Sequence, residues 1–184
     1  MQQKQRKLCN KVAPLSVADI REFSHHIRDL IRGTRFDSLK LNIAGILDHL
    51  RDTGQIEFEI VEDHQLQNEY AVSVPNEMLI KVRQSVYHNA ILGVPRDCFT
   101  LAHELGHLVL HRDTNPVYAR SQSDSFHHFT EDAEWQANTF ASEFLVDSRQ
   151  LEGLCSPRDI ANRFGVSLET AGILYERYEK SGIL

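Results

Sequence analysis

The chain has 184 residues, of which 41% are hydrophobic and 25% charged, and its formal net charge is −6. This composition excludes a disordered chain, and the length suits one principal domain rather than two independent cores. Because no apolar run approaches the roughly 20 residues of a membrane helix and the first residues lack a signal-peptide core, we expect a cytoplasmic protein without a membrane segment.

The distribution of cysteines and charges narrows the possible sites and partners. Cys9, Cys98 and Cys155 show no CxxC spacing, which argues against a disulfide framework or a zinc ribbon. The first 40 residues contain nine Lys/Arg against four Asp/Glu, a balance of +5 that leaves −11 for the remainder. Two interpretations of this basic face stay open, namely a solvated surface and a contact for a polyanion such as single-stranded DNA.

The first half of the chain predicts helices followed by strands. Residues 16–33 and 38–54 carry apolar side chains at helical spacing, and each stretch ends on a glycine. Residues 56–88 are instead rich in alternating, β-branched and aromatic side chains. We therefore expect two amphipathic helices and then two or three antiparallel strands.

The second half predicts helices on either side of a loop. One helix covers the apolar stretch at 99–111, and a polar, aperiodic segment at 112–130 predicts a mobile loop. A further helix is expected over 131–146. The last thirty residues predict two short helices joined by a turn at Gly165.

Together these elements predict an α+β fold with a small antiparallel sheet. Residues 1–14 are expected to form a flexible N-terminus and residues 15–147 one domain. Residues 148–184 are expected to form a C-terminal helical segment packed on that domain.

The stretch "FTLAHELGHLVLH", residues 99–111, carries the pattern of a hydrolytic zinc site. His103 and His107 are four residues apart, so both imidazoles lie on one helix face and can bind one ion, while Glu104 can lie beside the catalytic water. The alternative is a pair of core histidines hydrogen-bonded to their neighbours. His111 lies about 12 Å along the helix axis from His103, too far to share an ion with it.

The helix at 131–146 offers the third protein ligand that such a site needs. On a helical wheel Glu134 falls at the edge of the buried stripe, whereas the other acids, including Glu143, point away from its centre. Asn138, one turn after Glu134, can orient this carboxylate or hydrogen-bond a ligand histidine. The alternative is that Glu134 simply reaches solvent past the helix edge.

These two stretches together match a family pattern. "FTLAHELGHLVLH" followed by "EWQANTFASEFLV" resembles the ImmA/IrrE metallopeptidases of bacteria and phages, which carry HExGH, then a Glu that opens an ExxAN-x-FA helix, then a C-terminal helical segment. The resemblance implies a zincin-like, gluzincin-like domain in which His103, His107 and Glu134 bind Zn²⁺ and Glu104 is the general base. Family members typically cleave a helix-turn-helix repressor encoded nearby and thereby release stress-response, mobile-element or phage-defence genes, so a repressor is the implied substrate.

Three residues outside this pattern are candidates for further roles. Tyr87 and His88 fall at the end of the last predicted strand, where either can stabilise the transition state or simply belong to the surface. The edge of that strand can also pair with an extended substrate. Cys98 stands where the family usually has a polar residue, so a zinc-ligating thiolate that displaces the catalytic water and a buried, inert thiol both stay open.

The C-terminal stretch "PRDIANRFGVSLETAG" also resembles a helix-turn-helix, which leaves a rival function open. Under that hypothesis the protein is a metal-containing DNA-binding regulator. Residues 156–184 hold four basic and four acidic side chains, so the strong positive field of a DNA reader is missing. The presence of Glu104 favours the enzyme, because a structural metal site needs ligands but no base.

Overall fold

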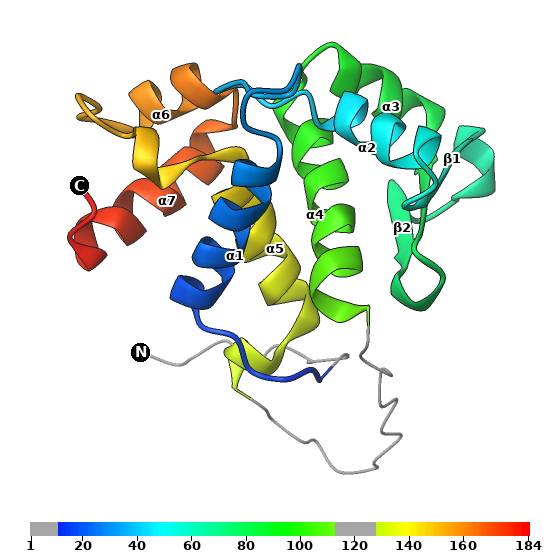
Figure 1. Cartoon of the computed structure of the whole chain (residues 1–184), viewed down its shortest axis with the longest axis horizontal. Helices are drawn as coiled ribbons and strands as arrows, with labels where there is room; N and C mark the ends of the chain where they lie inside the picture. Colours follow the sequence, from blue (N-terminus) through cyan, green and yellow to red (C-terminus); the bar gives the residue numbers. More distant parts are fainter. Residues whose placement is uncertain (1–10, 113–127) are drawn as a thin grey trace.

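The computed structural model describes residues 11–112 and 128–184, and its centre is a pair of helices that pack side by side (Figure 1). A three-stranded sheet covers one of these helices, α4, and helix α1 covers the other, α5. The helices and strands are α1 (Val17–Leu30), α2 (Ile43–Asp52), β1 (Glu57–Val61), β2 (Ala71–Val74), β3 (Leu79–Arg83), α3 (Gln84–Ile91), α4 (Pro95–His111), α5 (Ala133–Leu145), α6 (Pro157–Phe164) and α7 (Leu168–Ser181).

The two N-terminal helices form where the sequence predicts them. Ser16 caps α1, because its hydroxyl accepts a hydrogen bond from the Asp19 amide while the Asp19 carboxylate accepts one from the Ser16 amide. Asn42 caps α2 by accepting a hydrogen bond from the Gly45 amide at 2.9 Å. Ile20 of α1 is fully buried, but Phe23 and Leu30 of the same apolar pattern are 36% and 68% exposed, so the amphipathic prediction is confirmed only in part.

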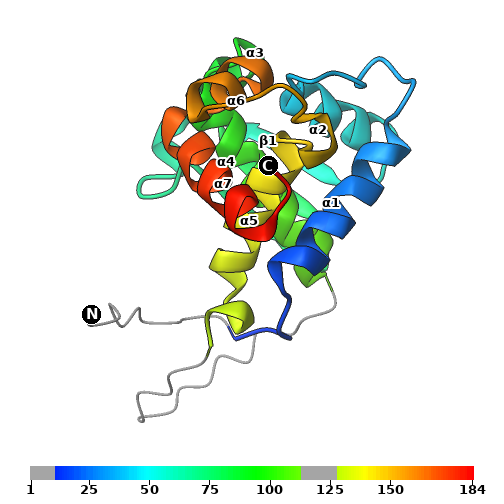
Figure 2. The ribbon, with the colours of Figure 1, turned by 90° about the vertical axis from the view of Figure 1, so that its left-hand side faces the viewer.

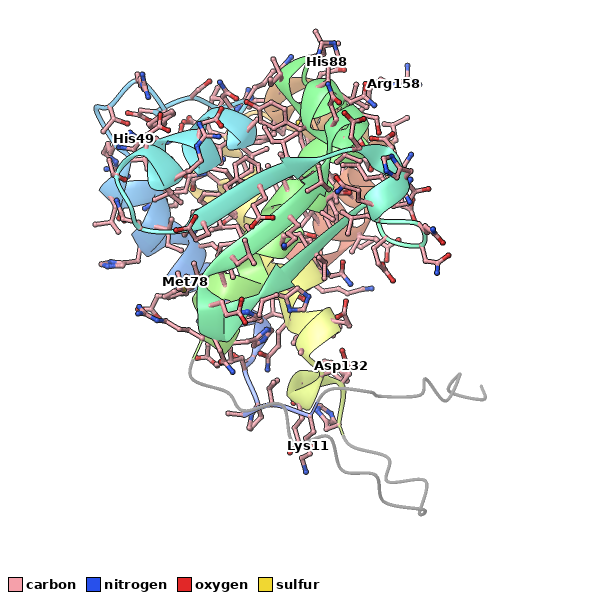
Figure 3. The ribbon with its side chains drawn as sticks, turned by 90° about the vertical axis from the view of Figure 1, so that its right-hand side faces the viewer. Lys11, His49, Met78, His88, Asp132 and Arg158 are labelled. Atoms are coloured by element: carbon pink, nitrogen blue, oxygen red, sulfur yellow. The ribbon has the colours of Figure 1, made fainter. Side chains whose placement is uncertain are left out.

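The strands form a mixed sheet in the order β1-β3-β2. β2 pairs antiparallel with β3, but β1 pairs parallel with β3, so the prediction of a wholly antiparallel sheet is wrong for one pair. The physical reason is that residues 62–70 carry the chain from β1 to the far side of β3 before β2 begins. β2 then returns into β3 through the turn at Met78, whose φ is 51°. β2 is consequently an edge strand, and it lies against α4 (Figure 3).

The last predicted strand is shorter than expected. β3 ends at Arg83, and residues 84–91 form α3, although the strand prediction continued to residue 88. The buried side chains of this stretch are Val86 and Ala90, which are four residues apart. This is the spacing of a helix face and not the alternation of a strand.

Helices α4 and α5 approach each other closely because small residues lie between them. A Cβ atom at Gly106 would lie 2.9 Å from Cδ1 of Phe140 and 3.3 Å from Cα of Ala137. A side chain at this position would therefore push the helices apart. The glycine of the HExGH pattern thus sets the distance at which α4 and α5 present their polar residues to each other.

Glu143 on α5 is buried, contrary to the helical-wheel prediction. It is 1% exposed, and its carboxylate accepts hydrogen bonds from Arg21 at 2.8 Å, from Arg177 at 3.0 Å and from Tyr178 at 3.1 Å. The wheel assumed one buried stripe, whereas α5 contacts α4, α1 and α7 around its circumference (Figure 2). The Glu143 cluster therefore joins the C-terminal helices to the centre of the molecule.

The N-terminal segment is held against the start of α5. The predicted flexible N-terminus spans residues 1–14, of which the first ten lie outside the described residues. Lys11 forms a β-bridge with Asp132 (Figure 3), and the Val12 amide donates a hydrogen bond to the Glu131 carbonyl at 2.9 Å. Backbone contacts thus connect residues 11 and 12 to the start of α5, and the flexibility of residues 1–14 stays a prediction.

The remaining predictions concern residues 112–130 and the C-terminal helices. Most of the predicted mobile loop, residues 113–127, lies outside the described residues. α6 and α7 form the predicted pair of C-terminal helices, joined through Gly165 at φ 71°, and Tyr178 of α7 is fully buried. Within the described parts of the chain, none of the helices has the length and apolar character to cross a membrane.

Candidate metal centre

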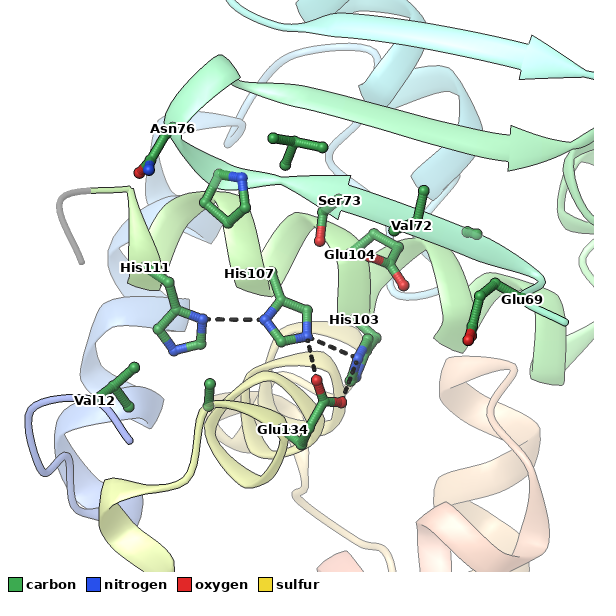
Figure 4. Close-up of a pocket in the computed structure, with 14 residues that line it drawn as sticks. Val12, Glu69, Val72, Ser73, Asn76, His103, Glu104, His107, His111 and Glu134 are labelled. Carbon is green, nitrogen blue, oxygen red and sulfur yellow. Dashed lines mark hydrogen bonds and ion pairs between the residues drawn. The ribbon is translucent and has the colours of Figure 1, made fainter. Parts of the chain in front are cut away.

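Helices α4 and α5 bring three metal-binding side chains together. His103 and His107 lie one turn apart on α4, and their Nε2 atoms are 3.0 Å apart. The carboxylate oxygens of Glu134, in the first turn of α5, lie 3.3 Å from Nε2 of His103 and 3.4 Å from Nε2 of His107 (Figure 4). The ligand atoms of these three residues all lie within 4.8 Å of one another.

This set of donors fits a zinc ion. Two imidazole nitrogens and one carboxylate form a ligand set of catalytic zinc sites that keep a fourth position open. Donor atoms that surround zinc tetrahedrally at about 2.1 Å lie about 3.4 Å apart. The separations of 3.0, 3.3 and 3.4 Å are close to that spacing, so one cation can bind all three side chains.

Two further polar side chains hold the histidine rings from behind. Nδ1 of His103 lies 3.1 Å from Oδ1 of Asn138, and Nδ1 of His107 lies 3.1 Å from Nδ1 of His111. Because the amide oxygen of Asn138 can only accept, Nδ1 of His103 is the donor, and its Nε2 faces the centre. The structure thus brings Asn138 to a histidine of the cluster.

The electrostatics of the centre favour a negative carboxylate. Hydrogen bonds from His103 and His107 lower the pKa of Glu134 and outweigh the opposing effect of burial. Burial alone lowers the pKa of His103, but the hydrogen bond to Glu134 and the nearby Glu104 carboxylate raise it overall. Burial lowers the pKa of His111. Without a cation, the His103 ring therefore gains a proton more readily than an ordinary histidine.

Glu104 faces the same pocket as the three donors. It is 8% exposed and lies between α4 and the edge strand β2, close to Ser73 (Figure 4). The pocket has a volume of about 610 Å³ and also includes His103, His107 and Glu134 in its lining. Its opposite wall is a continuous piece of β2 and the turn that follows, formed by Ala71, Val72, Ser73, Val74, Pro75 and Asn76.

His111 and Gln136 extend the site beyond what the sequence predicts. His111 lies outside the metal-binding group, in agreement with the distance argument, yet it contacts the ring of His107. Its Nε2 lies 3.0 Å from Oε1 of Gln136, which is 1% exposed. The sequence could have indicated the contact between His107 and His111, because these histidines are four residues apart and lie on one helix face. The sequence gives no such signal for Gln136, because its contacts with His111 and with the Ala13 carbonyl join residues that are 25 and 123 positions apart.

Cys98 is not directed at the centre. α4 begins at Pro95, so the helix is continuous through Cys98, which turns its side chain away from the pocket. The thiol is 8% exposed and lies 3.5 Å from the Ala90 carbonyl, and burial raises its pKa to about 11. The structure therefore does not bring Cys98 to the metal centre, and its position favours the alternative of a buried, inert thiol.

Tyr87 and His88 are also remote from the pocket. Both belong to α3 rather than to a strand, and neither lines the pocket. The Tyr87 hydroxyl donates a hydrogen bond to Asp48 at 2.8 Å, and Figure 3 shows His88 at the end of the sheet opposite Met78. The structure therefore does not bring these two residues to the metal centre, and the edge strand beside the site is β2.

Comparison with known proteins places this geometry in a family. A Mycobacterium tuberculosis transcriptional regulator of known structure has a similar fold, with a TM-score of 0.52 and 23% sequence identity. The match covers 83% of this chain and 45% of the regulator, so the chain spans less than half of that protein's length. No curated protein matches the sequence. Residues 57–173 match the IrrE N-terminal-like domain of Peptidase M78, and the chain therefore belongs to this peptidase family.

Proposed function

We propose that this protein is a zinc-dependent endopeptidase. The observation that carries the proposal is the position of Glu104, whose carboxylate faces the pocket that also contains His103, His107 and Glu134. A metal site with a purely structural role needs ligands but no carboxylate base open to the same pocket. Membership of a peptidase family supports the same conclusion.

Each residue of the site has a distinct role in this proposal. His103, His107 and Glu134 hold the zinc ion, and Asn138 orients His103. Bound zinc lowers the pKa of a water molecule to about 7 and polarises the carbonyl of the scissile peptide bond. Glu104 accepts the proton of the attacking water and delivers it to the leaving amine as the C–N bond breaks.

The shape of the pocket favours an extended peptide as substrate. Among the described residues, no strand pairs with the outer edge of β2, which forms one wall of the pocket. The backbone N–H and C=O groups at such an edge can pair with another extended chain. A peptide docked along residues 71–74 would pass in front of Glu104.

The resemblance to the ImmA/IrrE family supports a particular substrate class. We infer that the peptide belongs to a helix-turn-helix repressor, whose cleavage derepresses stress-response, mobile-element or phage-defence genes. Single-stranded DNA as the activating ligand stays a prediction that rests on the basic residues near the N-terminus. Direct DNA binding by the full chain without any cleavage would favour the rival function of a DNA-binding regulator.

The proposal is tested by replacing Glu104 alone. In Glu104→Gln the zinc ligands are intact but the base is lost, so zinc binding should persist and cleavage should fall by at least about 100-fold. Wild type and variant are incubated in lysate, with and without single-stranded DNA, and new protein N-termini are sequenced. Full cleavage by the variant, or the same N-termini in both samples, would contradict the proposal.

A further inference from the structure

The outer edge of β2 offers backbone hydrogen bonds at two defined residues. β2 and β3 pair antiparallel, and the Arg83 amide donates a hydrogen bond to the Tyr70 carbonyl at 3.1 Å. In such a pair, residues that bond to the neighbouring strand alternate with residues whose N–H and C=O groups point away from it. Along this register, the groups of Ala71 and Ser73 point away from β3. An extended peptide can therefore pair with β2 at these two residues.

A peptide in this position lies beside the metal centre. Ser73 lies close to Glu104 in the pocket, and His103 belongs to the same lining (Figure 4). Glu104 is 8% exposed, and in the described part of the chain no hydrogen bond or ion pair engages its carboxylate. A buried polar group without a partner in its own chain is available to a bound molecule. The part of the peptide that pairs with Ser73 is thus the part presented to the metal centre.

The two ends of the pocket differ in charge. Glu69, two residues before Ala71, lines one end, whereas Val12 and Asn76 line the other (Figure 4). Among the described residues, the lining contains no Lys or Arg. A substrate side chain at the Glu69 end therefore meets a carboxylate without a competing cation.

The Glu69 carboxylate is available to bind a cationic side chain. Glu69 is exposed, and it forms no hydrogen bond or ion pair with any residue that the structure describes. The guanidinium groups of Arg83 and Arg96 lie over the ring of the neighbouring Tyr70, at 5.1 and 4.0 Å from its centre. Neither arginine lines the pocket. Both cations are therefore engaged by Tyr70, outside the pocket.

We propose that Glu69 is a specificity-determining residue that selects Lys or Arg in the substrate. The inference rests on the proposed endopeptidase function, because it concerns the side chains that the same pocket accepts. An extended peptide advances about 3.4 Å per residue, and Glu69 precedes Ser73 by four residues, so the selected side chain lies within about four positions of the scissile bond. The opposite end of the pocket, lined by Val12 and Asn76, imposes no preference for a charge.

The preference is tested with the zinc-loaded full-length protein and synthetic peptides of randomised sequence. Sequencing of the products gives the residues on both sides of each cut bond. Wild type should enrich Lys and Arg on one side of that bond only. Glu69→Gln should lower this enrichment about two- to fivefold, which is the usual contribution of an exposed ion pair. Glu69→Lys should replace it with an enrichment of Asp and Glu.

Glu77→Lys is the matched control. Glu77 is exposed and follows β2, as Glu69 precedes it, but it does not line the pocket. The same change in net charge should therefore leave the enrichment within about twofold of wild type, because salt screens exposed charges outside the pocket. Cleavage without a preference for Lys and Arg, or an unchanged preference in Glu69→Lys, would overturn the inference. Absence of Glu104-dependent cleavage by wild type would instead contradict the proposed function.

A binding measurement separates direct charge pairing from a change in the shape of the pocket. The zinc-loaded Glu104→Gln variant holds peptides without cutting them. The probes are one peptide that wild type cleaves and a copy with Glu in place of its basic residue. The basic peptide should bind more tightly to Glu104→Gln, the added Glu69→Lys substitution should reverse this order, and salt should reduce both differences. An order that Glu69→Lys does not reverse would contradict charge pairing by Glu69.

Discussion

Glu143 shows how a single buried charge is made tolerable. A carboxylate removed from water loses several kcal/mol of hydration unless cations and hydrogen-bond donors replace it. Here Arg21 binds both oxygens, at 2.8 and 3.2 Å, and Arg177 and Tyr178 donate the remaining hydrogen bonds. The carboxylate in turn neutralises the two guanidinium groups, whose side chains are only 14% and 22% exposed.

Removing the charge of Glu143 should therefore destabilise the fold. Glu143→Gln leaves two partly buried guanidinium groups without a counter-ion, so the free energy of unfolding should fall by about 3 kcal/mol. Denaturant unfolding of the metal-free protein measures this change. Glu176→Gln is the control, since Glu176 is 73% exposed and pairs with the similarly exposed Lys180, and its effect should stay below about 0.5 kcal/mol. Equal effects of the two substitutions would show that the cluster contributes nothing specific.

At the level of elements, the site depends on how closely α4 and α5 pack. His103 and His107 come from one helix and Glu134 from the other, so the separation of the helices sets the separation of the donors. The absence of a side chain at Gly106 permits contact with Phe140 and with the backbone of Ala137. The glycine is thus required by packing and not by an unusual backbone conformation.

A methyl group at position 106 should disturb both packing and metal binding. Gly106→Ala places a Cβ atom 2.9 Å from Phe140, so the free energy of unfolding should fall by about 1 to 3 kcal/mol. Zinc binding should also weaken, because Glu134 moves away from the two histidines. Gly172→Ala is the matched control, because a Cβ at this helical position meets nothing within 4 Å. The free energy of unfolding of this control should rise by up to about 1 kcal/mol, because alanine has a higher helix propensity than glycine. A stabilised Gly106→Ala would contradict the packing argument.

The elements also show which parts of the structure the sequence can predict. Helical periodicity is local, so the sequence predicts that His103 and His107 share one helix face and that Glu134 lies at the edge of a buried stripe. The parallel pairing of β1 with β3 was missed, because strand order depends on where a connecting loop leads the chain. The sequence predicts Tyr87 at the end of a strand, whereas it lies in helix α3, because a short apolar stretch fits a strand and a helix equally well.

At the level of the whole molecule, the central helices are enclosed by segments from both ends of the chain. The N-terminal segment reaches Gln136 through the Ala13 carbonyl, and α7 reaches Glu143 through Arg177 and Tyr178. Neither contact has a counterpart in local sequence patterns, because the partners are more than thirty residues away. The burial of Glu143 and the contacts of Gln136 are therefore visible only in the folded chain.

Zinc should stabilise the whole molecule and not only the pocket. A ligand that binds only the folded state at 100 times its Kd adds about 2.7 kcal/mol, so a chelator should lower the unfolding temperature by several degrees. Glu134→Ala removes one of the three donors and should abolish most of this response. Glu104→Gln should keep it, because the base is not a ligand. A chelator response that is lost in Glu104→Gln but kept in Glu134→Ala would reverse the assigned roles.

The place of Glu134 along α5 has one more consequence. Asp132 caps this helix by accepting a hydrogen bond from the Trp135 amide, and Glu134 lies in the first turn. The aligned peptide dipoles make a helix N-terminus electropositive, which favours a nearby carboxylate by about 0.3 to 1 kcal/mol. The helix thus adds to the hydrogen bonds from His103 and His107 in favouring the ionised form of Glu134, so the negative charge that attracts a cation is already present when the metal arrives.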